Sequence, residues 1–370
     1  MIPKRGQIEL TFNWIYILIA GVVILLFFIG IVVKQKASSE QQLSSDVLRI
    51  MESIFTGAGV SEKTKNSIDA SSLGEYVFYF QCQEGVGEYG VAGTGNRVQD
   101  AIAPLFSPAE LPGARLSLWS LPYKLPYKVI DFLFVTSENT KYYLLGEAEF
   151  ATEFLAETTP DAGVQFRLNV QSITDPELAD PGQNFQVRLV DFTNTLVKDG
   201  LPVPSRLQSL DNTKVTAVAF PSPNHVDYYQ KEGMVWKKRT PNPLPIVSLG
   251  GLRDAAKYAA IFAGNEEIYT CNMQKAFRRL QYVTEVYTEH KLPELQAYYT
   301  ILHPDIGDSK PDCPGNLKNY DPNIEAALTS HRNRVAACLL SPSSCAELPD
   351  SAAAIKSLNE QLRLNCLTLY

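Results

Sequence analysis

Four histidines are the first residues to consider for acid–base or metal chemistry in this 370-residue chain: His225, His290, His303 and His331. None of them lies in an HExxH motif or has a second histidine within four residues, so a helical zinc site is not indicated. The chain also lacks the GxSxG nucleophile elbow and the P-loop motif. Paired carboxylates for glycoside hydrolysis stay open as an alternative, because the two acids can lie far apart in sequence. The sequence therefore assigns no catalytic residue and predicts no cofactor.

An acidic segment near the C-terminus is the second place where a ligand is conceivable. His303, Asp305, Asp308 and Asp312 lie in residues 303–316, a stretch rich in Pro, Gly and Asp that reads as a loop. Carboxylate oxygens suit a hard cation such as calcium. The EF-hand spacing and its terminal glutamate are absent, so the sequence favours a solvated acidic loop. No metal is predicted.

A glycine pattern follows the first strand-like stretch, which covers residues 75–82. Gly85, Gly87 and Gly90 have the G-x-G-x-x-G spacing of a dinucleotide fingerprint. That fingerprint must open a helix directly, so that backbone amides face the pyrophosphate. Here Gly93 and Gly95 follow instead. The prediction is a flexible loop over 85–96, without nucleotide binding.

Charge and cysteine content limit the compartment and the partners. The formal net charge is -7 and the pI is about 5.3, so nucleic acid is an unsuitable partner. The only basic triplet, Lys237-Lys238-Arg239, reads as a solvated strand end. Six cysteines allow complete pairing outside the cytoplasm, and six buried free thiols are the alternative. The LLSPSS segment between Cys338 and Cys345 is a short turn that a disulfide can close.

The first element that could position a site is an apolar run. It extends from Trp14 to Val33 and contains no charged residue. As a helix it would be about 30 Å long, which matches the hydrocarbon core of a bilayer. The run is too long for the core of a secretory signal. We therefore predict a short N-terminal segment (1–12), a transmembrane helix (13–33) and a single-pass protein in the cell membrane. Flanking charges slightly favour an extracytoplasmic body.

The residues ahead of this run resemble a known targeting signal. Lys4-Arg5-Gly6-Gln7, with Glu9 just before a long apolar helix, is similar to the class III signal of archaeal type IV pilin-like proteins. The resemblance covers about 30 residues and implies cleavage after Gly6, with the helix left as a membrane anchor or a filament core. That family usually has glutamate at the fifth mature position, where this chain has Thr11. The rest of the chain has the general character of archaeal surface proteins.

A second helical pattern follows the membrane segment without a break. Leu43, Val47, Ile50 and Ile54 have a 4-3-4 spacing, which places them on one face of a juxtamembrane helix over 34–56. We therefore expect one helix from about residue 12 to residue 55. Its apolar face has two interpretations: self-association through a short coiled coil, or packing against the protein's own globular body.

The remaining chain reads as α+β, with a β-rich domain (57–250) and a helical domain (251–370). Strands are predicted at residues 75–82, 129–135, 141–145, 164–170, 185–192, 214–220, 234–238 and 244–249. A sandwich-like arrangement is favoured over a doubly wound one, although the spacing leaves room for α/β crossovers. Residues 137–140 read as a hairpin turn. Helices are predicted at residues 147–156, 252–263, 265–291, 294–302, 322–340 and 351–367.

A direct repeat, Leu-Pro-Tyr-Lys at 121–124 and again at 125–128, lies inside a Pro- and Tyr-rich stretch at 104–128. Prolines four residues apart forbid a regular helix. We predict an extended edge segment that covers the core, with an exposed aromatic ridge as the alternative.

Three functions are compatible with these patterns. The first is a membrane-anchored protein whose extracytoplasmic body acts by binding or assembly. The second is a membrane-tethered enzyme of hydrolase type with a dispersed site. The third is a pilin-like filament subunit.

Overall fold

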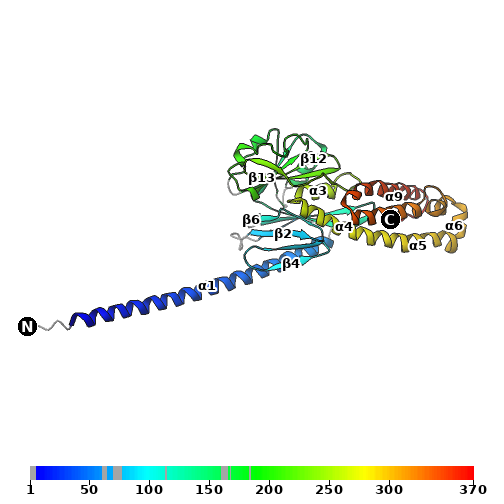
Figure 1. The fold of residues 1–370 in the computed structure, drawn as a ribbon. Helices are drawn as coiled ribbons and strands as arrows, with labels where there is room; N and C mark the ends of the chain where they lie inside the picture. The colour runs from blue at the N-terminus through cyan, green and yellow to red at the C-terminus, as the bar shows by residue number, and fades with distance from the viewer. Residues whose placement is uncertain are drawn as a thin grey trace, which may run out of the picture.

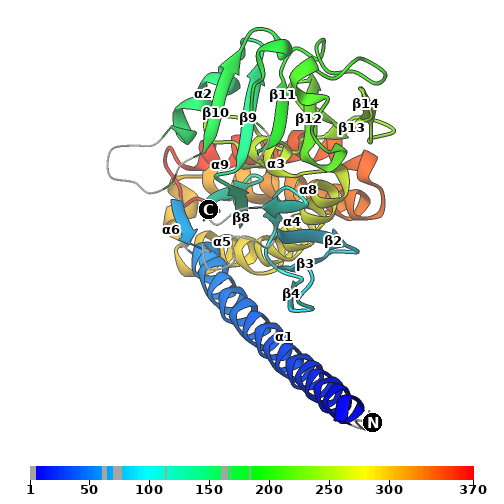
Figure 2. The ribbon, with the colours of Figure 1, turned by 90° about the vertical axis from the view of Figure 1, so that its left-hand side faces the viewer.

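A computed structural model describes residues 6–60, 65–69, 77–112, 115–159, 166, 168–182 and 185–370. A single long helix projects from a body of three β-sheets and a helical block (Figures 1 and 2). The described residues contain both helices and sheets, so the α+β class is confirmed at that level.

The projecting helix is α1 (Gly6–Val60), which is longer at both ends than the predicted 12–55. It contains no proline that would interrupt it. Its last third lies against the body, where Val47, Leu48, Met51 and Phe55 are buried. The predicted face is therefore engaged mainly by the protein's own body, because Leu43 and Ile54 also pack there, whereas Ile50 stays 54% exposed.

Two four-stranded sheets follow α1. Sheet I has the order β4-β3-β2-β6, and sheet II has the order β1-β7-β8-β5. The strands of sheet I are β2 (Val77–Gln83), β3 (Val86–Val91), β4 (Arg97–Asp100) and β6 (Glu110–Pro112). Those of sheet II are β1 (Lys65–Asp69), β5 (Leu105–Phe106), β7 (Arg115–Lys124) and β8 (Lys128–Ser137).

The loop predicted at 85–96 is wrong over its first half. β2 and β3 form a tight antiparallel hairpin in which Gln83 pairs with Val86. Glu84 and Gly85 make the turn with positive φ values of 53° and 82°, which glycine adopts without cost. The alternation of Tyr89 and Val91, both buried, is the strand signal that the glycines obscured.

The tandem repeat at 121–128 forms the end of the β7–β8 hairpin, so it is extended and lies at a sheet edge as predicted, whereas the alternative of an exposed aromatic ridge is wrong. Tyr123 and Tyr127 are only 2% exposed. The prolines are tolerated because β1 pairs with β7 only as far as Trp119, which leaves Pro122 without a second neighbouring strand. The repeat is therefore part of the core rather than of its surface.

Sheet III is mixed and has the order β10-β9-β11-β12-β13-β14, with β15 paired to β13. Its strands are β9 (Thr140–Leu145), β10 (Asn169–Ile173), β11 (Gln186–Asp191), β12 (Val215–Ser222), β13 (His225–Glu232), β14 (Val235–Lys238) and β15 (Leu244–Pro245). The first four strands of that order run parallel. The α/β crossovers for which the spacing left room are thus present, with α2 (Glu149–Thr158) between β9 and β10. Part of the strand predicted at 164–170 lies outside the described residues.

The turn at residues 138–139 does not close a hairpin, because β8 belongs to sheet II and β9 to sheet III. Sheets II and III each have a hydrophobic cluster packed on both faces. On β8, Leu133 and Val135 face the cluster shared with α1 and sheet I, whereas Phe132 and Phe134 face the large central cluster. Burial on both faces explains why these strands read as continuous apolar runs.

The C-terminal half is helical. The elements are α3 (Ala255–Phe262), α4 (Glu266–Val286), π-helical η5 (Tyr287–Lys291), α5 (Leu292–Ala297), π-helical η6 (Tyr298–Leu302), α6 (Pro304–Ser309), α7 (Asp312–Pro314), π-helical η7 (Gly315–Asn319), α8 (Ile324–Leu340), 3₁₀-helical η8 (Pro342–Glu347) and α9 (Leu348–Leu362). The loop predicted at 303–316 is therefore wrong, since short helices fill most of it. Pro304 opens the first of them at a position where its missing N–H costs nothing.

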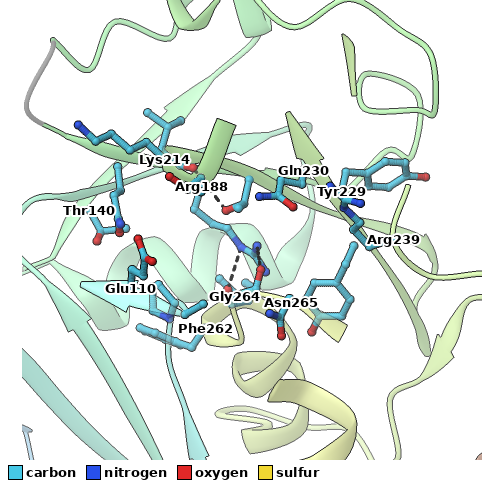
Figure 3. A pocket seen from close by; sticks show the side chains of 18 of the residues that line it. Glu110, Thr140, Arg188, Lys214, Tyr229, Gln230, Arg239, Phe262, Gly264 and Asn265 are labelled. Atoms are coloured by element: carbon cyan, nitrogen blue, oxygen red, sulfur yellow. Dashed lines mark hydrogen bonds between the residues drawn. The ribbon is translucent and has the colours of Figure 1, made fainter. Parts of the chain in front are cut away.

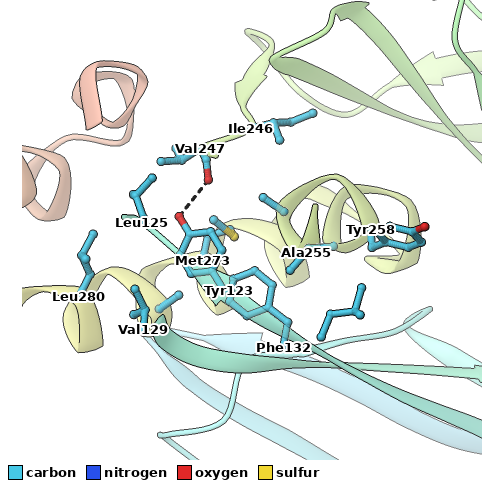
Figure 4. Close-up of a cluster of buried hydrophobic side chains, with 14 of the residues drawn as sticks. Tyr123, Leu125, Val129, Phe132, Ile246, Val247, Ala255, Tyr258, Met273 and Leu280 are labelled. Carbon is cyan, nitrogen blue, oxygen red and sulfur yellow. Dashed lines mark hydrogen bonds between the residues drawn. The ribbon is translucent and has the colours of Figure 1, made fainter. Parts of the chain in front are cut away.

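The large central cluster crosses residue 250, where the sequence suggests a domain boundary. Tyr123 and Phe132 of sheet II, Val247, and Met273 of α4 belong to it (Figure 4). The Tyr123 hydroxyl donates a hydrogen bond to the Val247 carbonyl at 2.9 Å. The helical block and the sheets thus share one core.

All six cysteines are paired, as expected for an oxidising compartment: Cys82–Cys271, Cys313–Cys366 and Cys338–Cys345. The third disulfide closes the LLSPSS turn as the sequence suggested. The first ties β2 to α4 across 189 residues.

Candidate functional site

The apolar part of α1 is the largest exposed hydrophobic feature of the described chain. Within the described residues one helix is long and apolar enough to cross a membrane, and its most apolar window has a mean hydropathy of 3.1 with no residue buried. Trp14, Leu25 and Phe28 are all more than half exposed. An exposed apolar stretch of this length is typical of a membrane anchor or a signal sequence.

A cleft of about 630 Å³ lies where four parts of the chain meet, and we call it the junction cleft. Its walls come from the end of the β7–β8 hairpin, from α2, from the loop before α3 and from α9. Both signs of charge line it: Glu153, Glu157 and Asp254 are acidic, whereas Lys124, Arg253 and Lys356 are basic. A volume of this size is in the range of small-molecule sites.

Asp254 is a buried carboxyl group of the junction cleft. It is 8% exposed and caps α3 by accepting a hydrogen bond from the Ala256 amide at 3.1 Å. Its other carboxylate oxygen accepts a short hydrogen bond from the Ser248 hydroxyl. Burial raises the pKa of Asp254, and these hydrogen bonds oppose the rise without cancelling it. A buried carboxyl group with a raised pKa is a candidate for acid–base chemistry.

The other two carboxylates of the junction cleft are engaged in a network. Glu153 accepts hydrogen bonds from the Arg253 amide at 2.9 Å and from the Tyr258 hydroxyl at 2.8 Å. Glu157 forms ion pairs with Arg253 at 2.7 Å and with Lys65 at 3.3 Å. Burial raises the pKa of Glu157, but hydrogen bonds from these two cations outweigh it and the net pKa is lowered. The pKa of Glu157 is thus lowered in the same cleft in which the pKa of Asp254 is raised.

A second, smaller cavity of about 140 Å³ lies at the amino ends of the parallel strands of sheet III, and we call it the amino-edge pocket (Figure 3). Thr140 begins β9, and Arg188 projects from β11 between the sheet and the end of α3. Arg239 borders the pocket from the segment after β14. None of these residues was singled out by sequence reasoning for a site, apart from Arg239 in its basic triplet.

The opposite edge of sheet III is where open parallel sheets usually bind ligands, at the carboxyl ends of neighbouring strands. Here β9 and β11 end at Leu145 and Asp191. The chain fills that position itself, since a Cβ on Gly146 would lie 2.3 Å from the Thr193 side chain. Asp191 is fully buried and accepts hydrogen bonds from the amides of Thr193, Leu196 and Val197. These contacts fold the loop over the strand ends.

The glycine pattern of the sequence has a structural role. Gly87 and Gly90 lie inside β3 of sheet I and do not open a helix. A Cβ on Gly90 would lie 2.5 Å from the Asn96 carbonyl oxygen, so close packing of the hairpin requires glycine there.

The histidines and the acidic segment are not brought together. Asp305 and Asp308 are exposed on α6, and Asp312 accepts a hydrogen bond from the Tyr320 hydroxyl at 3.1 Å. No group of three or more His, Cys, Asp or Glu side chains with metal-binding geometry occurs in the described part of the chain. His331 is buried under α9 with its Nδ1 2.8 Å from the Ser351 hydroxyl.

The basic triplet is divided among different environments. Lys237 forms a long ion pair with Asp199 at 3.9 Å, and Lys238 forms a close one with Asp227 at 2.9 Å. Arg239 alone turns to the amino-edge pocket. A continuous basic patch for nucleic acid is therefore not formed by these three residues.

Comparison with protein-family models, curated proteins and solved structures finds no match for this chain.

Proposed function

We propose that this is a single-pass membrane protein whose globular body lies on the extracytoplasmic side and acts by binding or assembly. The observation that carries the proposal is the uncovered apolar run of α1. Between Trp14 and Val33, large apolar side chains are exposed around the whole circumference of the helix.

The size of the exposed surface argues for a lipid environment. Burying one large aliphatic or aromatic side chain contributes about 1.5–3 kcal/mol. Seventeen such side chains between Trp14 and Val33 are exposed, so leaving them in water forgoes on the order of 25 kcal/mol or more. That exceeds the whole stability of a typical domain, which is about 5–15 kcal/mol. A bilayer is the simplest cover of matching length.

Membrane insertion is tested by expressing the full chain and floating the membranes on a density gradient after an alkaline wash. The chain should float with the lipid. Replacing both Leu18 and Leu25 by Arg should release it, because each arginine near the centre of a span costs about 2.5–3.5 kcal/mol. Leu340→Arg is the matched control, since Leu340 is 88% exposed on the body. Recovery of the uncleaved wild-type chain in the soluble fraction would contradict the anchor.

The three disulfides support an extracytoplasmic body, because the cytoplasm keeps cysteines reduced. In intact cells an impermeant maleimide should label no cysteine before reduction and should label the body after reduction by an impermeant phosphine. Labelling only after the membrane is permeabilised would place the body in the cytoplasm.

A second candidate is a membrane-tethered hydrolase, and the junction cleft is the observation that favours it. Asp254 would serve as the proton donor or acceptor, since its pKa is raised in the same cleft in which the pKa of Glu157 is lowered. A panel of chromogenic esters, phosphoesters and glycosides tests this. Asp254→Asn keeps the helix cap but should lower any turnover about 100-fold. Asp350→Asn, on the exposed start of α9, should leave turnover unchanged.

A third candidate, the pilin-like subunit, draws on the Lys4-Arg5-Gly6-Gln7 resemblance and on the uncovered α1. Sequencing the mature N-terminus tests it: a chain that begins at Gln7 supports processing, whereas an intact Met1 excludes it.

A further inference from the structure

The amino-edge pocket contains two buried polar atoms that have no hydrogen-bond partner. They are the hydroxyl oxygen of Thr140 and one carboxylate oxygen of Glu266. Thr140 is 2% exposed at the start of β9, and Glu266 is the first residue of α4. A buried polar group without a partner costs about 1–3 kcal/mol. Both side chains line the pocket, so a ligand held there can supply the missing partner.

The positive charges of the pocket are also incompletely matched. Arg188 is 3% exposed and donates hydrogen bonds to the carbonyls of Ile261 at 3.2 Å, Gly264 at 2.9 Å and Ala263. These bonds leave two of the five guanidinium hydrogens unused. Among the described residues, no carboxylate forms an ion pair with Arg188 or with Arg239. Burial lowers the pKa of Arg188, whereas its hydrogen bonds to the carbonyls at the end of α3 stabilise the charged guanidinium.

The placement of the charges disfavours a ligand of one sign. Glu110 and Glu266 repel a simple anion, and neither carboxylate forms an ion pair within the described chain. Arg188 and Arg239 repel a simple cation. In Figure 3, Glu110 and Thr140 lie on one side of Arg188, and Arg239 and Gln230 lie on the other. A ligand that carries both an ammonium and a carboxylate can pair its positive group with the pocket's glutamates and its negative group with the pocket's arginines.

The cavity also limits the ligand's size. Its volume of about 140 Å³ corresponds to roughly ten water positions, taking about 10–15 Å³ of probe volume for each. Drug-sized or nucleotide ligands need cavities of about 300 Å³ or more. The ligand is therefore small.

We propose that the amino-edge pocket binds a small zwitterion of the free amino acid type. The ligand ammonium donates hydrogen bonds to Glu266 and Thr140, and the ligand carboxylate accepts them from Arg239. The ring of Tyr228, which lies 5.4 Å from the Arg188 guanidinium carbon, forms an apolar wall beside these groups. This inference deepens the binding role proposed above, rests on it, and does not depend on the position of the membrane.

The test uses the oxidised full chain in detergent or nanodiscs, with the twenty free amino acids as probes in calorimetry and thermal shift. At least one amino acid should bind and raise the unfolding temperature. Acetate or propionate, which lack the ammonium, and ethylamine, which lacks the carboxylate, should bind about tenfold or more weakly, since hydrogen bonds to charged groups contribute about 1.5–3 kcal/mol.

Variants identify the contacts. Glu266→Gln, Thr140→Val and Arg239→Gln should each weaken amino acid binding, by about tenfold or more for the two charged positions. Glu267→Gln and Lys237→Gln are the matched controls, because both residues are exposed neighbours that do not line the pocket. A folded chain, shown by an unchanged unfolding temperature of each variant, is required for the comparison.

Three results would overturn the proposal. One is an absence of binding by any free amino acid to the folded chain, in which case water alone fills the pocket. Another is equal affinity for acetate and the amino acid. The third is binding of inorganic phosphate that Arg239→Gln abolishes and Glu266→Gln does not, which identifies a simple anion site. A chain that binds amino acids but does not float with lipid would instead contradict only the anchor.

Discussion

His331 shows how a single side chain can set the response of this protein to acid. It lies on α8, fully buried against α9 and the turn of the β7–β8 hairpin, and its ring lies 6.5 Å from that of Tyr127. Burial lowers the pKa of His331 to about 4, which a contact with the Leu125 backbone only partly offsets. The folded protein therefore holds this imidazole neutral at pH values where the unfolded chain protonates it.

The sign of the pH effect follows from linkage. Between the unfolded pKa of about 6.5 and the folded pKa of about 4, the unfolded state binds more protons, so stability falls as the pH falls. From pH 7.5 to pH 4.5 this one group should remove about 2.5 kcal/mol of unfolding free energy. Guanidinium unfolding at the two pH values measures the change.

His331→Asn should remove that part of the pH dependence, whereas His290→Asn, at an exposed position of η5, should keep it. Equal pH dependence in the two variants would show that His331 titrates normally in the folded protein.

At the scale of elements, the most informative one is α1, which serves two environments along one uninterrupted helix. Its first part is exposed, and its last part completes the core between sheets I and II. Met51 is fully buried there, while the adjacent Ile50 points away and is 54% exposed. The 4-3-4 pattern of apolar residues is therefore explained for the most part by packing within the chain.

Adjacent substitutions in α1 separate these two roles. Met51→Ala should destabilise the body by about 3 kcal/mol, the range for a buried methionine truncated to alanine. Ile50→Ala should change stability by about 0.5 kcal/mol or less. If the exposed side of this helix mediates self-association, Ile50→Ala should lower the mass measured by light scattering in detergent, which Met51→Ala need not do. An unchanged mass for Ile50→Ala would remove Ile50 from any such interface.

At the scale of the whole molecule, sheet II separates two cores, and sheet III bounds the larger one on its other side. The Cys82–Cys271 disulfide links β2 of sheet I to α4, which lies 189 residues later in the sequence. The three sheets and the helical block are thus held by shared cores and by one long-range covalent link.

The disulfides should differ in their contribution to stability. By loop-closure entropy, Cys82–Cys271 should contribute about 5 kcal/mol and Cys338–Cys345, with a separation of 7 residues, about 2.5 kcal/mol. Replacing each pair by serine and following unfolding in denaturant measures the difference. A larger loss for the short loop than for the long one would show that native-state strain or residual structure dominates.

Much of the element content could be predicted from sequence because it depends on local pattern. The strands at 129–135 and 214–220 and the helix at 265–291 were found at nearly their observed positions, since each is a long stretch with one clear period. The exposed apolar helix is likewise a property of consecutive residues. The even cysteine count agreed with complete pairing.

The errors share a physical cause. The exposed aromatic ridge considered for the 121–128 repeat was wrong because Tyr123 and Tyr127 are buried against Val247 and Thr284, which lie more than a hundred residues away in sequence. Strand β3 was not predicted because its glycines are typical of a loop. The close approach of the strand to Asn96 is what requires glycine there. In both cases a distant or cross-strand contact overrode a local preference.

By itself the sequence determined that one helix of this protein is apolar on all sides and long enough for a bilayer, because length and composition suffice for that property. Only the tertiary structure decided which of the 15 possible cysteine pairings forms and which charges meet. Thr140, Arg239 and Glu266 lie in three separate elements and share a pocket because the fold brings a strand start, a loop and a helix start together. Contacts between residues so far apart in sequence produce no periodic pattern from which they could be predicted.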